Sequence, residues 1–253
     1  MCIRDRSCIK YNCEHSIFKS IGYTLRNVYA RWTKAYLRNV DMFACITEFQ
    51  KKKLIEAGYD KNKITVIPNS IDAPCSYTPT SGEYIAYIGR LSYEKGYDLL
   101  VEVARKHPEI KFCFAGAQRE QKNTDIPSNV EFAGYLQKDK LLEFIQKARF
   151  IVIPSRCYEG FPMAILEAAC HGKPAIAPNH GGFTEIIGQG ENAIGKLFEP
   201  SNTDDLDKQI AELWNNQTLT EELGEKAFKK LKKHYDSEVV YKQWETLFSK
   251  LKN

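Results

Sequence analysis

The feature that most constrains the fold of this chain is a regular alternation of short apolar segments with longer amphipathic ones. The short segments are rich in Ile, Val and Phe and are apolar on both faces, as in strands of a parallel sheet covered on both sides. We expect strands at 42–47, 64–68, 84–89, 110–116, 130–133, 150–154, 174–177 and 196–198. Helical spacing of apolar residues predicts helices at 16–38, 48–57, 95–107, 138–148, 162–171, 203–215, 219–234 and 237–252. This alternation is typical of an α/β fold with a Rossmann-like, doubly wound parallel sheet.

A polar segment at 69–83 divides this pattern unevenly. It contains two Pro and one Gly, a composition typical of a linker between domains. Six expected strands follow it, enough for a complete domain, whereas the two before it are too few for a self-sufficient sheet. We therefore expect a remnant of an N-terminal domain with its linker at 1–76, a complete domain at 77–235, and a separate C-terminal helix at 236–253. Residues 1–7 show no periodicity and are treated as a non-native scar.

Composition and charge exclude several classes of protein. A chain of 253 residues with 43% hydrophobic residues can build a core, so wholesale disorder is excluded. The 36 Lys and Arg barely exceed the 32 Asp and Glu and form no basic tail, which argues against a nucleic-acid partner. Neither an apolar run of about 18–20 residues nor a signal peptide is present, so a cytoplasmic location is expected. Eight Cys without CxxC or Cys/His spacing predict reduced thiols and no metal centre.

The segment 154–168 is the most informative candidate for a binding site. It leads from the end of an expected strand through a polar loop into a helix that opens near Pro162. Ligands of open parallel sheets bind at the carboxyl ends of strands, and the free N–H groups of a helix start suit a phosphate. Gly160 lets the backbone approach a ligand, and Glu159 and Glu167 could each hold a hydroxylated group. Taken singly, each Glu is better explained as an ordinary loop or surface acid.

Two further strand-to-helix turns carry polar residues. Arg90 and Lys95 follow the strand at 84–89, and such a pair suits a pyrophosphate, although surface cations are usually only solvated. The turn at 179–185 contains two adjacent glycines, which alone are weak signals. The chain contains no GxGxxG, GxxxxGK[ST], HExxH or GxSxG motif.

Together, the motifs GRL..EKG, EGFPMAILEA, GKPAIA and GG..E resemble the family-4 (group 1) retaining glycosyltransferases of the GT-B fold. The resemblance covers roughly residues 16–250 and includes the pattern from Thr47 to Asp72. It implies that the chain holds the C-terminal half of a GT-B fold with a remnant of the N-terminal domain, and is N-terminally truncated. Two departures matter: the turn after Gly116 lacks the usual Gly-Pro, and the half that supplies a glycine-rich loop and a catalytic His is nearly missing. His15 is interpreted as a surface or capping residue.

The resemblance implies how a nucleotide-diphosphate sugar, UDP- or GDP-linked, would be held. Arg90 and Lys95 are expected to bind the diphosphate and Glu167 the ribose hydroxyls, while Tyr135 is placed loosely near the base. Members of the family are metal-independent, so the two cations and a helix dipole would stabilise the departing nucleoside diphosphate. No cofactor besides the donor substrate is expected.

The resemblance also implies the catalytic group. Glu159 is expected to contact the donor sugar as the catalytic residue, and the backbone of Gly160, Phe161 and Pro162 would lie beside that sugar.

The implied function is transfer of a hexosyl group to a carbohydrate or lipid-linked acceptor with retention of configuration, in bacterial polysaccharide or glycolipid synthesis. A peripheral membrane association through the missing N-terminal domain would place the protein at the inner face of the membrane. The alternative is a catalytically incomplete nucleotide-sugar-binding fragment or module; a GT-B epimerase or phosphorylase is less favoured. The last helix resembles the family's C-terminal segment that crosses back toward the N-terminal domain. With that domain largely missing, its apolar face with Trp244 and Phe248 would lose much of its partner and expose an apolar patch.

Overall fold

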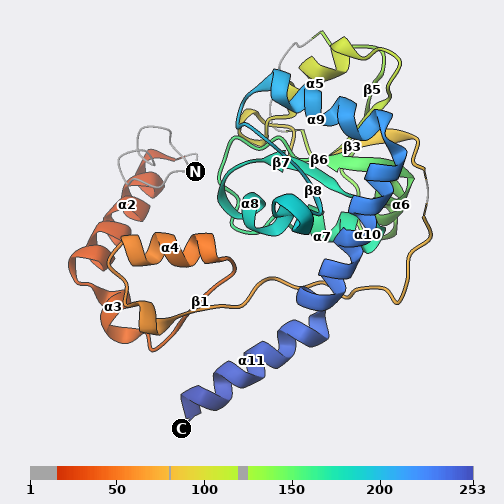
Figure 1. Cartoon of the computed structure of the whole chain (residues 1–253). Helices are drawn as coiled ribbons and strands as arrows, with labels where there is room; N and C mark the ends of the chain where they lie inside the picture. Colours follow the sequence, from red (N-terminus) through yellow and green to blue (C-terminus); the bar gives the residue numbers. More distant parts are fainter. Residues whose placement is uncertain (1–15, 80, 119–124, 253) are drawn as a thin grey trace. The chain divides into compact units, whose positions relative to one another are not determined.

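The computed structural model describes residues 16–79, 81–118 and 125–252 (Figure 1). The chain divides into two compact units. The first comprises Met1–Cys45 and Lys51–Val66, and the second comprises Ile46–Gln50 and Ile67–Asn253.

The described part of the first unit contains a long exposed helix and a small parallel sheet. Its elements are α2 (Ile17–Trp32), α3 (Ala35–Asn39), β1 (Phe43–Cys45), most of α4 (Glu48–Glu56), the 3-10 turn η1 (Lys61–Lys63) and β2 (Ile64–Val66). β1 and β2 pair in parallel, with Phe43 opposite Ile64. The single helix predicted at 16–38 is divided, because Lys34 adopts a left-handed φ of 52° before α3. Large apolar side chains of α2 are exposed, among them Phe18 at 87% and Trp32 at 82%.

The second unit is built on a six-stranded parallel sheet with the order β5-β4-β3-β6-β7-β8 (Figure 1). The strands are β3 (Tyr84–Ile88), β4 (Phe112–Ala115), β5 (Val130–Gly134), β6 (Ala148–Val152), β7 (Ala175–Pro178) and β8 (Gly195–Phe198). The chain adds strands outward from β3 to β5 and then from β6 to β8 on the other side. The direction of winding therefore reverses between β3 and β6, where ligands of such sheets bind. The predicted doubly wound α/β fold is confirmed.

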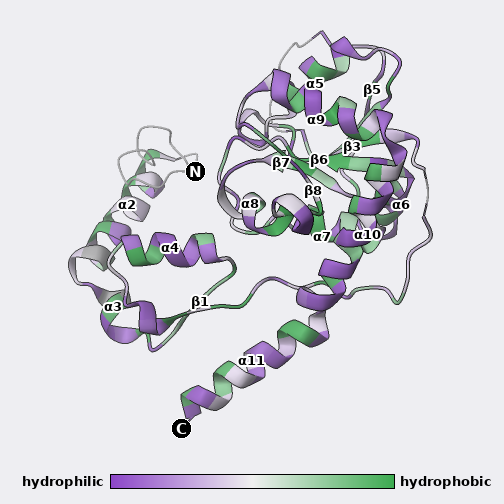
Figure 2. Cartoon of the chain, in the orientation of Figure 1, coloured by the Kyte–Doolittle hydropathy of each residue, from purple (hydrophilic) through white to green (hydrophobic). Residues whose placement is uncertain are grey.

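Helices cover both faces of this sheet. They are α5 (Tyr97–Lys106), α6 (Asp139–Lys147), α7 (Met163–Cys170), α8 (Gly181–Ile187), α9 (Thr203–Asn215) and α10 (Gln217–His234), with 3-10 turns η2 (Tyr93–Lys95) and η3 (Gly190–Asn192). The last helix, α11 (Ser237–Lys252), extends away from the sheet (Figure 1). Small strand residues such as Ala86 and Ala177 face the core formed with α6, α7, α8 and α10. Large residues such as Phe112 and Phe150 face the core formed with α5 and α9. The strands are green and the outer helix faces largely purple in Figure 2, as burial on both faces requires.

The polar segment 69–83 contains no helix or strand among its described residues, and it forms part of the second unit. The Ile71 N–H donates to the Tyr235 carbonyl at 3.0 Å, and the Ser237 N–H donates back to the Ile71 carbonyl at 3.1 Å. Further along, the rings of Tyr77 and Phe228 lie 4.9 Å apart. This segment is therefore held along α10 rather than free in solution.

The state of the cysteines and the character of the helices both bear on expectations from the sequence. Among the described residues Cys45, Cys113 and Cys170 are buried free thiols, Cys157 is half-buried and Cys75 is exposed. Within the same residues, every helix is too short or too polar to cross a bilayer.

Candidate functional site

Three predicted site residues, Arg90, Lys95 and Glu159, follow the ends of the two central strands β3 and β6. Arg90 comes two residues after β3, and Glu159 lies in the loop after β6, which pairs with β3 along its length. The ammonium group of Lys95 forms an ion pair with the Glu159 carboxylate. Arg90 makes a longer contact with Glu94 at 3.7 Å and is exposed. Two cations and a carboxylate therefore lie at the point where the winding of the sheet reverses.

A glycine lets the turn after β3 approach the end of β6. Gly96 has a left-handed φ of 70°, and a Cβ there would lie 1.9 Å from the Pro154 carbonyl oxygen. Any side chain would separate these segments, so Gly96 allows Lys95 to reach the loop after β6.

An arginine that the sequence analysis did not single out anchors the same loop. The Arg156 guanidinium forms two hydrogen bonds of 2.7 and 2.8 Å to the Asp98 carboxylate and donates to the Tyr93 carbonyl at 2.7 Å. It also lies 4.1 Å from the centre of the Tyr93 ring. This planar, bidentate contact ties the loop to the start of α5. Sequence offers no signal for it, because Arg156 and Asp98 are 58 positions apart.

The carboxylate oxygen of Glu159 that pairs with Lys95 is also contacted by a buried hydroxyl. Ser155 Oγ lies 3.2 Å from Glu159 Oε1, and a ring nitrogen of His180 lies 3.2 Å from the Ser155 carbonyl. Burial lowers the pKa of His180, which favours the neutral ring at this position. The Gly182 N–H donates to the Glu159 carbonyl at 2.9 Å. The loops after β6 and β7 are therefore joined through backbone contacts around Glu159.

Glu167 has a different environment on α7. It is half-buried, and desolvation by burial raises the pKa of its carboxyl group. Among the described residues no side chain or backbone group forms a hydrogen bond or ion pair with it. A half-buried carboxylate without a partner is costly, so its acceptor oxygens are available for hydroxyl groups of a ligand.

The remaining predicted residues differ in their burial and in their distance from the two central strands. Phe161 is buried and its ring packs edge-on against Tyr235 at 5.5 Å, so only its backbone can face a ligand. Pro162 is buried and caps α7, and Gly160 precedes them in the same loop. Tyr135 follows β5, two strands away from β3, and is 69% exposed. Gly160, Phe161 and Pro162 thus lie in the loop after β6 with Glu159, whereas Tyr135 lies two strands away from β3.

Residues 46–50 of the second unit also contact this loop. The amide nitrogen of Gln50 would lie 2.4 Å from a Cβ on Gly160, and the rings of Phe49 and Tyr158 are 5.4 Å apart. The Glu185 carboxylate accepts hydrogen bonds from the backbone N–H groups of Glu48 and Phe49 at 3.1 and 3.2 Å. The GG..E motif includes Glu185 and could have signalled it, but nothing in the sequence singled out Gln50.

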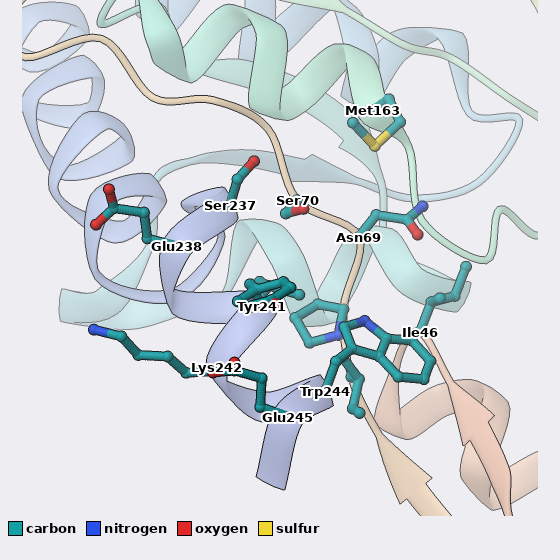
Figure 3. Close-up of a pocket in the computed structure, with 13 residues that line it drawn as sticks. Ile46, Asn69, Ser70, Met163, Ser237, Glu238, Tyr241, Lys242, Trp244 and Glu245 are labelled. Atoms are coloured by element: carbon teal, nitrogen blue, oxygen red, sulfur yellow. The ribbon is translucent and has the colours of Figure 1, made fainter. Parts of the chain in front are cut away.

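A hollow of about 860 Å³ in the second unit lies between α11, residues 67–70 and the start of α7. Figure 3 shows Tyr241 and Trp244 of α11 lining it together with Asn69 and Met163. None of the charged candidates at the β3–β6 junction lines it. Beyond the hollow, α11 exposes Phe248 at 55%, and the ring of Phe248 stacks 5.8 Å from that of Trp244. Of the two residues expected in an exposed patch on this helix, Phe248 is exposed and Trp244 is half-buried.

Two family models match this chain. Residues 76–230 match the model described as glycosyl transferases group 1, and residues 13–73 match that of glycosyltransferase family 4. The chain belongs to the group 1 glycosyl transferases. The family resemblance predicted from the motifs is confirmed.

Relatives of this glycosyltransferase-family chain include proteins from several bacteria and an archaeon. It is 33% identical over 193 residues to an uncharacterized glycosyltransferase of Methanocaldococcus jannaschii, covering 74% of this chain and 53% of that protein. It is 34% identical over 198 residues to a 42.6 kDa protein in the cps region of Klebsiella pneumoniae, and the match covers 72% of this chain and 51% of that protein. It is 29% identical over 203 residues to mannosylfructose-phosphate synthase of Agrobacterium fabrum, covering 67% and 44%. The chain spans about half the length of the curated relatives it matches.

Solved structures of GT-B glycosyltransferases share its fold. HepE of Anabaena, crystallised with UDP, matches with a TM-score of 0.76 at 18% identity, covering 85% of this chain and 65% of that one. Sucrose-phosphate synthase of Thermosynechococcus elongatus matches with a TM-score of 0.74 at 21% identity, covering 87% and 60%. At these identities the likeness shows the fold alone.

Proposed function

We propose that this chain binds a nucleotide-diphosphate sugar and takes part in transferring its hexosyl group to an acceptor with retention of configuration. The observation that carries the proposal is the ion pair of Lys95 and Glu159, close to Arg90, at the reversal of winding in the sheet. Family membership supports transfer chemistry. The UDP complexes of HepE support a nucleotide donor, on the basis of fold likeness.

The diphosphate of the donor would take the place of Glu159 as the partner of Lys95. Both side chains of this pair are about three quarters buried or more, with 24% and 20% of their surface exposed. A phosphate would therefore meet a cation already shielded from water, and exposed Arg90 would add a planar fork. Together with the N-terminus of α7, these cations would stabilise the departing nucleoside diphosphate without a metal ion or cofactor.

Once released from Lys95, the Glu159 carboxylate would face the donor sugar, with Ser155 still holding one of its oxygens. The backbone from Gly160 to Pro162 would line the same side. Glu167 would accept hydrogen bonds from the two ribose hydroxyls, because its carboxylate has acceptor capacity that no described residue uses. The exposed ring of Tyr135 would stack on the base.

For the acceptor, we propose a carbohydrate or a lipid-linked carbohydrate. Relatives named for exopolysaccharide phosphotransfer and for the cps region support a role in polysaccharide or glycolipid synthesis. Such a protein would work in the cytoplasm, at the inner face of the membrane. Since this chain spans about half of its relatives, the alternative is a nucleotide-sugar-binding fragment or module without turnover.

Calorimetry with UDP, GDP and UDP-glucose tests donor binding. Glu167→Gln should weaken binding about 10–100-fold, because hydrogen bonds to a charged group contribute about 1.5–3 kcal/mol. Glu159→Gln should leave the affinity within a few fold while lowering transfer. The exposed Glu222→Gln on α10 is the control and should bind as the wild type does.

The outcomes separate the two candidates. Failure of the wild-type chain to bind any nucleotide diphosphate would reject both. Donor binding with no transfer to a panel of sugar acceptors would favour the binding module. Equal affinity of the Glu167 variant and the control would remove Glu167 from the site.

A further inference from the structure

The C-terminal half of α10 and the η3 turn enclose a second hollow of about 340 Å³ in the second unit. Its lining from α10 is strongly basic, and only one acid faces it. The lining residues are Lys226, Lys229, Lys230, Lys233 and His234 from α10 and Glu191, Asn192 and Ile194 from the η3 segment. We call this hollow the α10–η3 pocket.

The spacing of these lysines places them on a single face of the helix. Positions 226, 229, 230 and 233 follow the i, i+3, i+4, i+7 pattern, so like charges are neighbours along that face. Like charges at this spacing destabilise a helix, whereas the helix dipole favours cations only in the last turn. The dipole thus accounts for Lys233 and His234 but not for Lys226, two turns earlier.

The charge of this face is only partly neutralised by the protein. Lys229 pairs with Glu225 at 2.5 Å. Lys230 Nζ instead donates to the Ile186 carbonyl at 2.7 Å, which fixes its ammonium group by a neutral backbone acceptor. Within the described residues, Lys226 and Lys233 form no ion pair.

Burial lowers the pKa of two groups of this lining, and neighbouring lysines add to the effect at His234. The pKa of His234 is lowered, first by burial and then by Lys233 and Lys230. The pKa of Lys230 is lowered by burial, against the opposing effect of Glu185. With Glu191 as the only acid of the lining, an anion in the pocket would relieve repulsion that already exists in the folded protein.

We propose that the α10–η3 pocket binds a phosphate group, carried either by a soluble phosphate ester or by an anionic lipid headgroup. Its volume is at the lower end of the range of about 300–1,000 Å³ for ligand pockets, which suits a small anion rather than a whole nucleotide. It shares no residue with the β3–β6 junction. The inference is therefore independent of the proposed function.

The test follows the ring protons of His234 by NMR in the full chain, identified by their loss in His234→Gln. Inorganic phosphate should raise the pKa of His234 along a saturating curve, whereas sodium chloride at equal ionic strength should not. Lys226→Gln combined with Lys233→Gln should weaken this response at least tenfold. Lys250→Gln combined with Lys252→Gln removes the same charge from exposed positions of α11 and should leave it unchanged.

A sedimentation experiment distinguishes the two sources of phosphate. Binding to vesicles of phosphatidylcholine and phosphatidylglycerol in equal parts, but not to phosphatidylcholine alone, would identify a lipid headgroup if the Lys226 and Lys233 double variant loses it. A response to soluble phosphate without vesicle binding would identify a soluble ester. The proposal is overturned if phosphate leaves the pKa of His234 unchanged and the anionic vesicles do not bind the chain. It is also overturned if sodium chloride gives the same shift as phosphate, or if both double variants respond equally.

Discussion

The contact between the loops after β6 and β7 leads to a quantitative prediction for Gly182→Ala. A Cβ on Gly182 would lie 2.4 Å from the Gly160 carbonyl oxygen and 2.9 Å from that of Glu159. Ordinary contact begins at 3.4 Å, so the Gly160 carbonyl must retreat by about 1 Å. Both oxygens belong to the backbone, so no side-chain rotation can relieve the clash. The same movement lengthens the hydrogen bond from the Gly182 N–H to the Glu159 carbonyl, now 2.9 Å.

The cost has a structural and a functional part. Overpacking costs about 1–3 kcal/mol and loss of one hydrogen bond about 1 kcal/mol, so the free energy of unfolding should fall by about 2–4 kcal/mol. Gly182 has no left-handed φ, so alanine adds no backbone strain. Because the displaced loop carries Glu159, transfer should fall by up to about 100-fold, as expected for a 1 Å misplacement of a reacting group.

Urea unfolding followed by circular dichroism measures the first effect, and calorimetry with UDP followed by a transfer assay measures the second. Gly22→Ala is the control, since a Cβ there has nothing within 4 Å and the residue lies inside α2. That change should be neutral or stabilise by up to about 1 kcal/mol through helix propensity. A Gly182→Ala protein with wild-type stability and donor affinity would refute the argument that these loops are packed together.

Two further predictions follow from single side chains. Burial raises the pKa of Glu167, so the folded protein loses stability as the pH rises from the pKa of an unfolded Glu to the raised pKa of the folded state. In urea unfolding, Glu167→Gln should therefore be more stable than wild type at pH 7 but not at pH 4. An equal difference in the free energy of unfolding between wild type and variant at both pH values would contradict this. Arg156→Lys should lower the free energy of unfolding by about 1–2 kcal/mol, because lysine cannot reproduce the bidentate contact with Asp98. The exposed Arg105→Lys should change it by less than about 0.5 kcal/mol, and a similar loss in both variants would count against a special role for Arg156.

Much of the second unit could be predicted because apolar spacing reports burial locally. Each of its expected strands has a counterpart in the structure, although the observed ends differ from the expected ones by up to two residues. The helix α8 was expected only as an opening turn, since its seven residues begin with Gly181 and Gly182 and offer little periodicity. The break at Lys34 was not predicted, because a left-handed lysine leaves no trace in the pattern of apolar residues.

The candidate site was also predictable only in part from the sequence. The motifs indicated Arg90, Lys95, Glu159 and Glu167, because charged residues at strand ends and helix starts are recognisable one segment at a time. Their roles toward a donor stay predictions. The Arg156 anchor was not predicted, because that side chain has no motif and acts through a partner that is remote in sequence.

The sequence by itself determined the order and type of the elements, the family, and the residues that could hold a diphosphate, since each depends on patterns within a few neighbouring positions. Only the tertiary structure decided that Lys95 pairs with Glu159, 64 positions away, and that Gly182 packs against Gly160. Both contacts depend on the strand order, which places β6 beside β3 and β7 beside β6. Strand order results from packing of the whole sheet, and local periodicity carries no information about it.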